Sequence, residues 1–282
     1  INITKKINII STIHIPLTHP VHAAKICKSL IAINKGKAGR IYINLVAGCV
    51  KTDLEIFNLE NFKLREKYKI ASDWIKLFKK SIMANKPFNA NYEHFKGKNI
   101  VADINHKVKE VPKIISAGYS PEGKNFALNS CDYQFTFFNN LERSKEQNLK
   151  IKHEMRKKNK NVKLLSNIHI VSGKSEQNVK RNFQKYFKLI DKKSVEIFYN
   201  NLTRNNPKLK NILKLDKKLI SSIGLGCGSY LLVGTPKEIV KKFSIIKKSG
   251  FYGVAISFCD YKNDLDFFCK NILPSLKRKK IA

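Results

Sequence analysis

Short apolar runs alternate with amphipathic stretches along most of the chain, and this alternation limits the possible folds most strongly. The helical stretches lie between most of the apolar runs. Regular alternation of strand and helix is typical of α/β proteins with a parallel sheet. Periodicity predicts six strands, at residues 7–15, 40–46, 112–116, 132–137, 163–171 and 252–258.

Several helical stretches carry signals for their ends. The segment TPKEIVKKFSIIKKSG predicts a helix with Thr235 as N-cap and Pro236 in its first turn, ending at Gly250. A second helix is predicted over 21–33. In KLREKYKIASDWIKLFKKSI, helical spacing predicts an inward face made of Ile70, Trp74, Leu77, Phe78 and Ser81.

No internal repeat or long linker divides the chain, so the sequence predicts one domain over 1–282, with insertions at about 51–110 and 175–222. A parallel β/α barrel needs eight strands. On that fold the first two βα units would be missing upstream, and the start at Ile1 fits this deficit. A doubly wound open sheet is the alternative, because strand order cannot be derived from one sequence.

The charge balance suggests a nucleic-acid partner, but its distribution argues against one. The net charge is +34, with 55 basic residues. Few of these are arginines, and the lysines run through every segment, whereas nucleic-acid recognition favours arginine and a concentrated basic face. The sequence predicts a lysine-rich surface, no nucleic-acid partner and no membrane partner. Without an apolar span or a signal peptide, we expect a cytoplasmic protein.

The cysteines and clustered histidines predict no metal centre. None of the 6 cysteines forms a CxxC pair, and most have apolar neighbours, so we expect reduced core residues. Three histidines fall close together in HIPLTHPVH, at 14, 19 and 22. No carboxylate accompanies them, so a metal site there is the less favoured alternative.

The segment SAGYSPEGKNF, at 116–126, resembles a phosphate-binding loop but departs from the triphosphate pattern. Asn125 stands where Ser or Thr should be, and Pro121 removes a backbone donor. Ser120 can cap the following helix, and Gly123 allows close approach of a ligand. The segment predicts either a phosphate at a helix N-terminus or an ordinary capped turn.

Six segments in fixed order resemble the bacterial luciferase-like flavin-dependent monooxygenases, and the match spans nearly the whole chain. Within that family the likeness is to the branch acting on pyrimidines, alkanesulfonates and dimethyl sulfone. The resemblance implies a (β/α)8 TIM barrel with helical insertions, lacking its first two βα units, that binds FMN at the C-terminal ends of its strands. The segments are STIHIPLTHPVHAAK, NKGKAGRIYINLVAG, REKY, SAGYSPEGKNFALNSCDY, YLLVGTPKEIV and GFYGVAISFCDY.

The resemblance also implies roles for particular residues. Asn44 and Asp53 match flavin-contacting positions, and Lys67 and Tyr68 match positions near the ribityl phosphate. In AGYS, Gly118 belongs to the phosphate-binding turn and Ser120 matches a phosphate-binding serine. Each residue also has an ordinary structural explanation, such as a surface position on a helix. Cys49 stands where the family often has tryptophan, which puts the shape of the substrate pocket in question.

Two further candidates lie at the end of the first strand. On a barrel, Thr12 and His14 would point near the flavin or the substrate. We predict that His14 handles a proton or orients the substrate, because the ordinary pKa of histidine is near neutrality. A structural histidine is the alternative.

Together these features predict an FMN-dependent monooxygenase that activates O2 on reduced flavin and oxygenates a small organic substrate of sulfonate, sulfone or pyrimidine type. Its partner would be a separate flavin reductase, and a homo-oligomer is left open. The alternatives are a non-catalytic or truncated flavin-binding relative and a deazaflavin-dependent oxidoreductase. The flavin carries the oxygen chemistry in such enzymes, while the protein binds and shields it.

Overall fold

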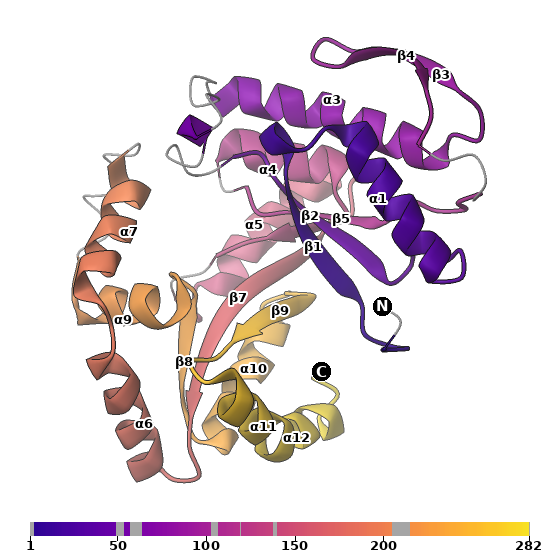
Figure 1. The fold of residues 1–282 in the computed structure, drawn as a ribbon. Helices are drawn as coiled ribbons and strands as arrows, with labels where there is room; N and C mark the ends of the chain where they lie inside the picture. Colours follow the sequence, from indigo (N-terminus) through magenta and orange to yellow (C-terminus); the bar gives the residue numbers. More distant parts are fainter. Residues whose placement is uncertain are drawn as a thin grey trace. The chain divides into compact units, whose positions relative to one another are not determined.

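Parallel strands and the helices after them form both parts of the molecule in a computed structural model (Figure 1). The structure describes residues 3–48, 54–56, 64–102, 107–118, 120–137, 140–204 and 215–281. The chain divides into two compact units, residues 1–135 with 155–163, and residues 136–154 with 164–282. Each unit is described by itself.

The first unit contains a parallel sheet in the order β1–β2–β5–β6 and a separate antiparallel hairpin, β3–β4. Its strands are β1 (Ile9–His14), β2 (Ile41–Val46), β3 (Phe88–Asn91), β4 (Lys96–Ile100), β5 (Lys113–Ser116) and β6 (Tyr133–Phe135). Its helices are the short 3-10 helix η1 (Ile15–Leu17), α1 (Pro20–Ile33), α3 (Leu64–Met83) and α4 (Pro121–Ser130).

The core of this unit lies between one face of the sheet and helices α1 and α3. In β2, Ile41, Ile43 and Leu45 alternate with less buried residues and face this core. The inward face predicted for α3 is confirmed, since Trp74 and Phe78 are fully buried and stack on each other. This packing leaves the alternate residues of β1 and β2, which include the predicted site residues, on the opposite face of the sheet.

The second unit contains three parallel strands, with β7 between β8 and β9. Its elements are α5 (Ser144–Lys157), β7 (Lys163–Ser172), α6 (Glu176–Lys188), α7 (Lys192–Arg204), α9 (Lys217–Gly226), β8 (Tyr230–Gly234), α10 (Pro236–Lys248), β9 (Gly253–Ser257), α11 (Tyr261–Asn271) and α12 (Leu273–Arg278). The cap predicted for α10 is confirmed, because Glu238 accepts a hydrogen bond from the Thr235 backbone N–H at 2.7 Å.

Two expectations from the sequence are wrong. The count of six strands omitted three, namely β8, formed by YLLVG, and the two strands of the β3–β4 hairpin. These runs of four or five residues are too short to show a clear alternation. The cysteines are not all core residues. Cys27 is buried, but three cysteines are exposed, namely Cys227, Cys259 and Cys269.

Candidate functional site

Thr12 and Asn44 are paired neighbours on adjacent strands of the first unit. They occupy the same register position of β1 and β2, and the Asn44 Nδ2 atom donates to Thr12 Oγ1 at 3.3 Å. The Asn44 Oδ1 atom is buried and has no hydrogen-bond partner among the residues that the structure describes. A buried acceptor without a donor is costly, so this oxygen points to a ligand that donates a hydrogen bond.

The N-terminus of α4 brings together three further predicted residues. Ser120 is the N-cap, and its Oγ accepts a hydrogen bond from the Gly123 N–H at 3.1 Å. Tyr68, from α3, places its hydroxyl beside Gly118 and Gly123. A Cβ atom at either glycine would lie 2.5 Å from the Tyr68 Oη atom. The two glycines are therefore needed to admit the tyrosine.

This turn combines hydroxyl groups with the N-terminus of a helix, which is a favourable place for an anion. One neighbouring group opposes that preference. Glu122, in the first turn of α4, has a buried Oε2 atom with no hydrogen-bond partner in the described part of the chain. A carboxylate and a phosphate repel each other. This carboxylate was not predicted to matter, since a glutamate in the first turn of a helix is an ordinary feature.

A cavity of about 360 Å³ lies along β1 and α1. Most of its lining residues are apolar, and the polar ones are Ser11, Thr12, His14 and Thr18. Its volume is within the range of small-molecule sites, roughly 300–1,000 Å³. His14 and Thr12 thus line this cavity, but its other walls include Ile41 and Ile43, which face α1. The cavity therefore lies on the helix side of the sheet and not on the face that carries Asn44.

The remaining predicted residues are less informative. Lys67 is half-buried next to Tyr68 on α3. Asp53 and Cys49 lie outside the described residues. Within the described ranges, the histidines near residues 14–22 do not gather as metal ligands, and the group that most resembles a metal site comprises Glu66, Glu93 and His94.

The second unit contains a buried histidine that the sequence analysis did not select. His169 of β7 is 1% exposed, and its Nδ1 atom lies 2.8 Å from Ser257 Oγ. Its Nε2 atom lies 3.3 Å from the Cys259 Sγ. Burial lowers the pKa of His169 to about 4. Cys259 is exposed as a residue, but its thiol lies against the buried ring, and partial burial of the thiol together with the nearby Asp264 raises its pKa to about 11. Both groups are therefore neutral near pH 7, so this pair is not an activated thiolate.

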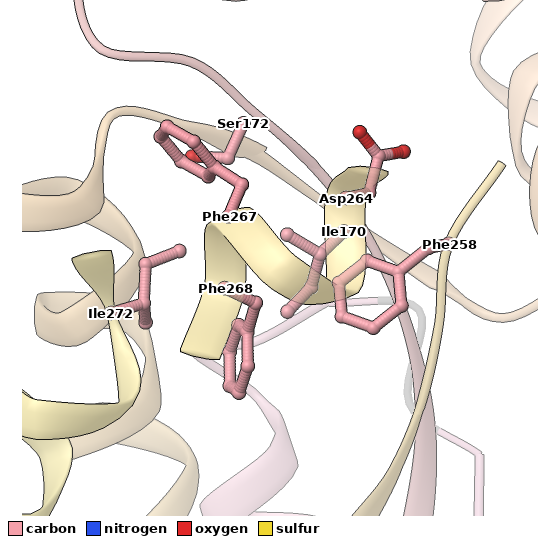
Figure 2. A pocket seen from close by; sticks show the side chains of 7 residues that line it. All are labelled: Ile170, Ser172, Phe258, Asp264, Phe267, Phe268 and Ile272. Atoms are coloured by element: carbon pink, nitrogen blue, oxygen red, sulfur yellow. The ribbon is translucent and has the colours of Figure 1, made fainter. Parts of the chain in front are cut away.

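Another cavity lies in the second unit, beside α11, and is lined mainly by apolar side chains (Figure 2). Its volume is about 10 Å³. Roughly this volume is needed to hold one water molecule. It is lined by Ile170, Ser172, Phe258, Asp264, Phe267, Phe268 and Ile272. The cavity along β1 is therefore the better candidate for a small-molecule site.

The fold and these features define a parallel α/β protein with a polar pair on two strands and an anion-favouring helix N-terminus. No model of a known protein family matches the chain. Two curated relatives are FMNH2-dependent dimethylsulfone monooxygenases from Pseudomonas putida and Pseudomonas fluorescens (strain Pf0-1). They are 21% and 22% identical over 278 residues, which cover 97% of this chain and 75% and 74% of the relatives.

Solved structures of monooxygenases are also similar to this chain. The long-chain alkane monooxygenase LadA aligns with a TM-score of 0.82 and 18% identity, over 99% of this chain and 71% of LadA. DmoA from Hyphomicrobium sulfonivorans aligns with a TM-score of 0.84 and 16% identity, over 99% of this chain and 69% of DmoA. The chain has the luciferase-like α/β barrel fold. The resemblance to the luciferase-like flavin-dependent monooxygenases is confirmed.

Among the residues that the structure describes, no helix is long and apolar enough to cross a lipid bilayer.

Proposed function

We propose that this protein is an FMN-dependent monooxygenase that uses reduced FMN and O2 to oxygenate a small organic substrate. The relatives named FMNH2-dependent dimethylsulfone monooxygenases support the enzyme class and the cofactor. Reduced FMN, when bound, supplies the electrons that activate O2. The protein residues bind the cofactor, orient the substrate and exclude water.

The observation that carries the proposal is the unpartnered Oδ1 atom of Asn44. Its amide group is fixed, because the Nδ2 atom donates to Thr12 at 3.3 Å. A flavin ring carries N–H groups that can donate to such an oxygen, so the donor set fits FMN. Asn44 lies on β2, and in parallel α/β proteins ligands bind at the carboxyl ends of the strands.

The turn at Ser120 is the proposed site for the cofactor phosphate. The hydroxyl groups of Ser120 and Tyr68 and the N-terminus of α4 favour an anion, and Lys67 adds a positive charge on the same helix as Tyr68. These groups must outweigh the nearby carboxylate of Glu122. His14 at the wall of the 360 Å³ cavity is the proposed group that orients the substrate or moves a proton.

The proposed substrate is a small molecule of sulfone, sulfonate or pyrimidine type. The sulfone alternative is supported by the names of both curated relatives. Because the proposed enzyme consumes reduced flavin at each turnover, it needs a separate flavin reductase as a partner.

The test is an anaerobic titration of the protein with reduced FMN, followed by oxidised FMN, with binding measured by calorimetry. We expect saturable binding of reduced FMN, and the variant Asn44→Ala should bind it roughly 5- to 100-fold more weakly. That range corresponds to the loss of one buried hydrogen bond, about 1–3 kcal/mol. Asn129→Ala, an exposed asparagine on α4, is the matched control and should bind like the unmodified protein.

Three results would contradict parts of the proposal. Equal affinities of the Asn44→Ala variant and the control would remove the role of the amide. Saturable binding of a deazaflavin without binding of FMN would replace the monooxygenase by a hydride-transfer enzyme. If reduced FMN binds but no sulfone, sulfonate or pyrimidine is oxygenated with a reductase present, the protein is a flavin-binding relative of these enzymes.

A further inference from the structure

His94 occupies the turn that joins β3 and β4, and both of its ring nitrogens meet carboxylates of α3. The Nδ1 atom lies 2.9 Å from Asp73 Oδ2, and the Nε2 atom lies 2.8 Å from Glu66 Oε1. The His94 backbone N–H also points to Asp73 Oδ2, at 3.4 Å. The side chains of His94 and Asp73 are only 16% and 12% exposed. The imidazole thus attaches the hairpin turn to two points of α3.

The number of hydrogen-bond donors fixes the protonation state in this arrangement. Ionised carboxylates only accept hydrogen bonds, so both ring nitrogens of His94 must donate. A neutral imidazole has one donor and one acceptor, whereas the imidazolium has two donors. Only protonated His94 can therefore make both bonds. The neutral ring would direct a lone pair at one of the two carboxylates.

The surrounding charges reinforce this conclusion. The hydrogen bonds that His94 donates to Asp73 and Glu66 raise the pKa of His94, and the nearby Glu93 adds to this effect. The His94 hydrogen bond also lowers the pKa of Glu66. Burial alone would raise the pKa of Asp73, but hydrogen bonds from His94 and Lys76 outweigh it and lower the pKa.

Two further groups lie near His94, and one of them opposes its charge. Lys69 on α3 lies 4.0 Å from Glu66 and 3.9 Å from Glu93, so it competes with the imidazolium for the same negative charge. On the side of α1, the ring of His19 packs against Phe95 at a centroid distance of 5.6 Å. Burial and the nearby His22 lower the pKa of His19, whereas that of His94 is raised, so His19 loses its proton at a lower pH than His94 does.

The same side chains could suggest a metal ion, but the geometry favours a proton. The Nε2 atom of His94 and Oε1 of Glu66 are at hydrogen-bond distance, 2.8 Å. Two ligands on one zinc ion, each about 2.0–2.2 Å from it, lie farther apart in tetrahedral geometry. In addition, the Lys69 ammonium occupies the space between Glu66 and Glu93.

We propose that protonated His94 is a latch that holds the β3–β4 hairpin against α3, and that loss of this proton releases the turn. Figure 1 shows the hairpin beside α3. Glu66 and Asp73 lie on either side of Tyr68 along α3. The latch therefore braces the part of α3 that presents Tyr68 to the N-terminus of α4.

The direction of the pH dependence follows from linkage. A histidine whose pKa is raised by folding stabilises the closed state fully below its ordinary pKa, about 6.5, and the effect is lost as pH rises through the raised value. The two carboxylates act in the opposite direction, because their lowered pKa values make their contribution fall as pH drops below about 4. The latch is therefore firmest between these limits and opens on the alkaline side.

The test is amide hydrogen exchange of residues 88–100 in the full chain between pH 5 and 9, corrected for the intrinsic exchange rate. We expect constant protection up to about pH 6.5 and then a fall of up to about tenfold per pH unit until His94 is neutral. In His94→Gln the protection should be low and independent of pH. His153→Gln, which replaces an exposed histidine of α5, should keep the original profile.

A second variant keeps the test valid if His94→Gln does not fold. In Glu66→Gln the new amide can donate to Nε2, so neutral His94 satisfies both partners. The alkaline fall in protection should then disappear or move to lower pH. Protection of the hairpin that does not change between pH 6 and 9 in the unmodified protein would overturn the latch, as would an unchanged profile in either variant.

The metal alternative is tested in the same system. Addition of one equivalent of zinc chloride at pH 8 should leave the protection of residues 88–100 unchanged. Restoration of full protection by zinc in the unmodified protein, absent in His94→Gln, would overturn the proton latch and assign the site to a metal.

Discussion

Two histidines in different units show how their partners decide the charge of a buried imidazole. His94 in the first unit and His169 in the second each have partners at both ring nitrogens. The partners of His94 are carboxylates, and its pKa is raised. The partners of His169 are a hydroxyl and a thiol, and burial lowers its pKa to about 4.

The comparison shows that a second hydrogen bond does not by itself protonate histidine. A hydroxyl can donate or accept, so Ser257 is compatible with a neutral ring at His169. Ionised carboxylates cannot donate, and their charge offsets the cost of burying the imidazolium at His94. The contributions of the two rings to stability therefore depend on pH in opposite directions. The His94 contribution falls as pH rises, and the His169 contribution falls as pH drops.

The largest expected effect is the acid destabilisation caused by His169. A histidine with a folded pKa of about 4 must lose stability as pH falls from the ordinary value toward 4, because the unfolded chain binds the proton more strongly. The difference of about 2.5 pKa units corresponds to roughly 3 kcal/mol. We expect His169→Gln to lack this part of the acid loss, measured by urea unfolding between pH 4 and 7.

The control for this prediction is the difference between variant and unmodified protein at each pH, in which all other titrating groups cancel. At pH 7 the variant should be the less stable protein, because the glutamine side chain does not have the shape of the ring that packs in this site. Parallel stability curves from pH 7 to 4 would show that His169 is not buried and neutral as the structure has it.

The second prediction concerns the space that Gly226 leaves for the ring of His169. Gly226, at the end of α9, lies against this ring, and a Cβ atom there would be 2.6 Å from the His169 Cβ. We expect Gly226→Ala to destabilise the protein by about 1–3 kcal/mol, the usual cost of overpacking. Thermal unfolding would measure the loss.

Gly253→Ala is the matched control in the same unit. Its Cβ atom would meet Leu165 at 3.4 Å, which is ordinary contact. The control should unfold within about 1 kcal/mol of the unmodified protein. If Gly226→Ala loses as little stability as the control, His169 moves aside freely. The enclosure that keeps the ring neutral would then be absent.

Much of the fold followed from the sequence, because its signals are local. The apolar stripe of α3 and the caps at Ser120 and Thr235 depend on residues within one or two turns, and each is confirmed. Strand β8 was missed, because a buried parallel strand need not show alternation. The luciferase-like fold came from the order of several motifs.

The site was predictable only in part, because its decisive features depend on contacts between distant segments. The sequence placed Thr12 and Asn44 on strands but not in register, and it gave no sign that Tyr68 would lie between two glycines. His94 was not selected at all. Its partners on α3 lie 21 and 28 residues earlier in the chain, and no local pattern joins them.

The smallest expected effect is that of Lys76 on the pH range in which the His94 contacts are lost. Lys76 lies 3.3 Å from Asp73 Oδ1, and its side chain is 59% exposed, so the pair itself adds less than about 1 kcal/mol of stability. Lys76→Met removes a positive charge that competes with the imidazolium for Asp73. The alkaline fall in protection of residues 88–100 should therefore continue to a higher pH before it levels off, by less than one unit. Lys241→Met, at an exposed position of α10, should not move it. A shift toward lower pH in Lys76→Met would mean that the lysine supports the latch by holding Asp73 in place and does not oppose it by charge.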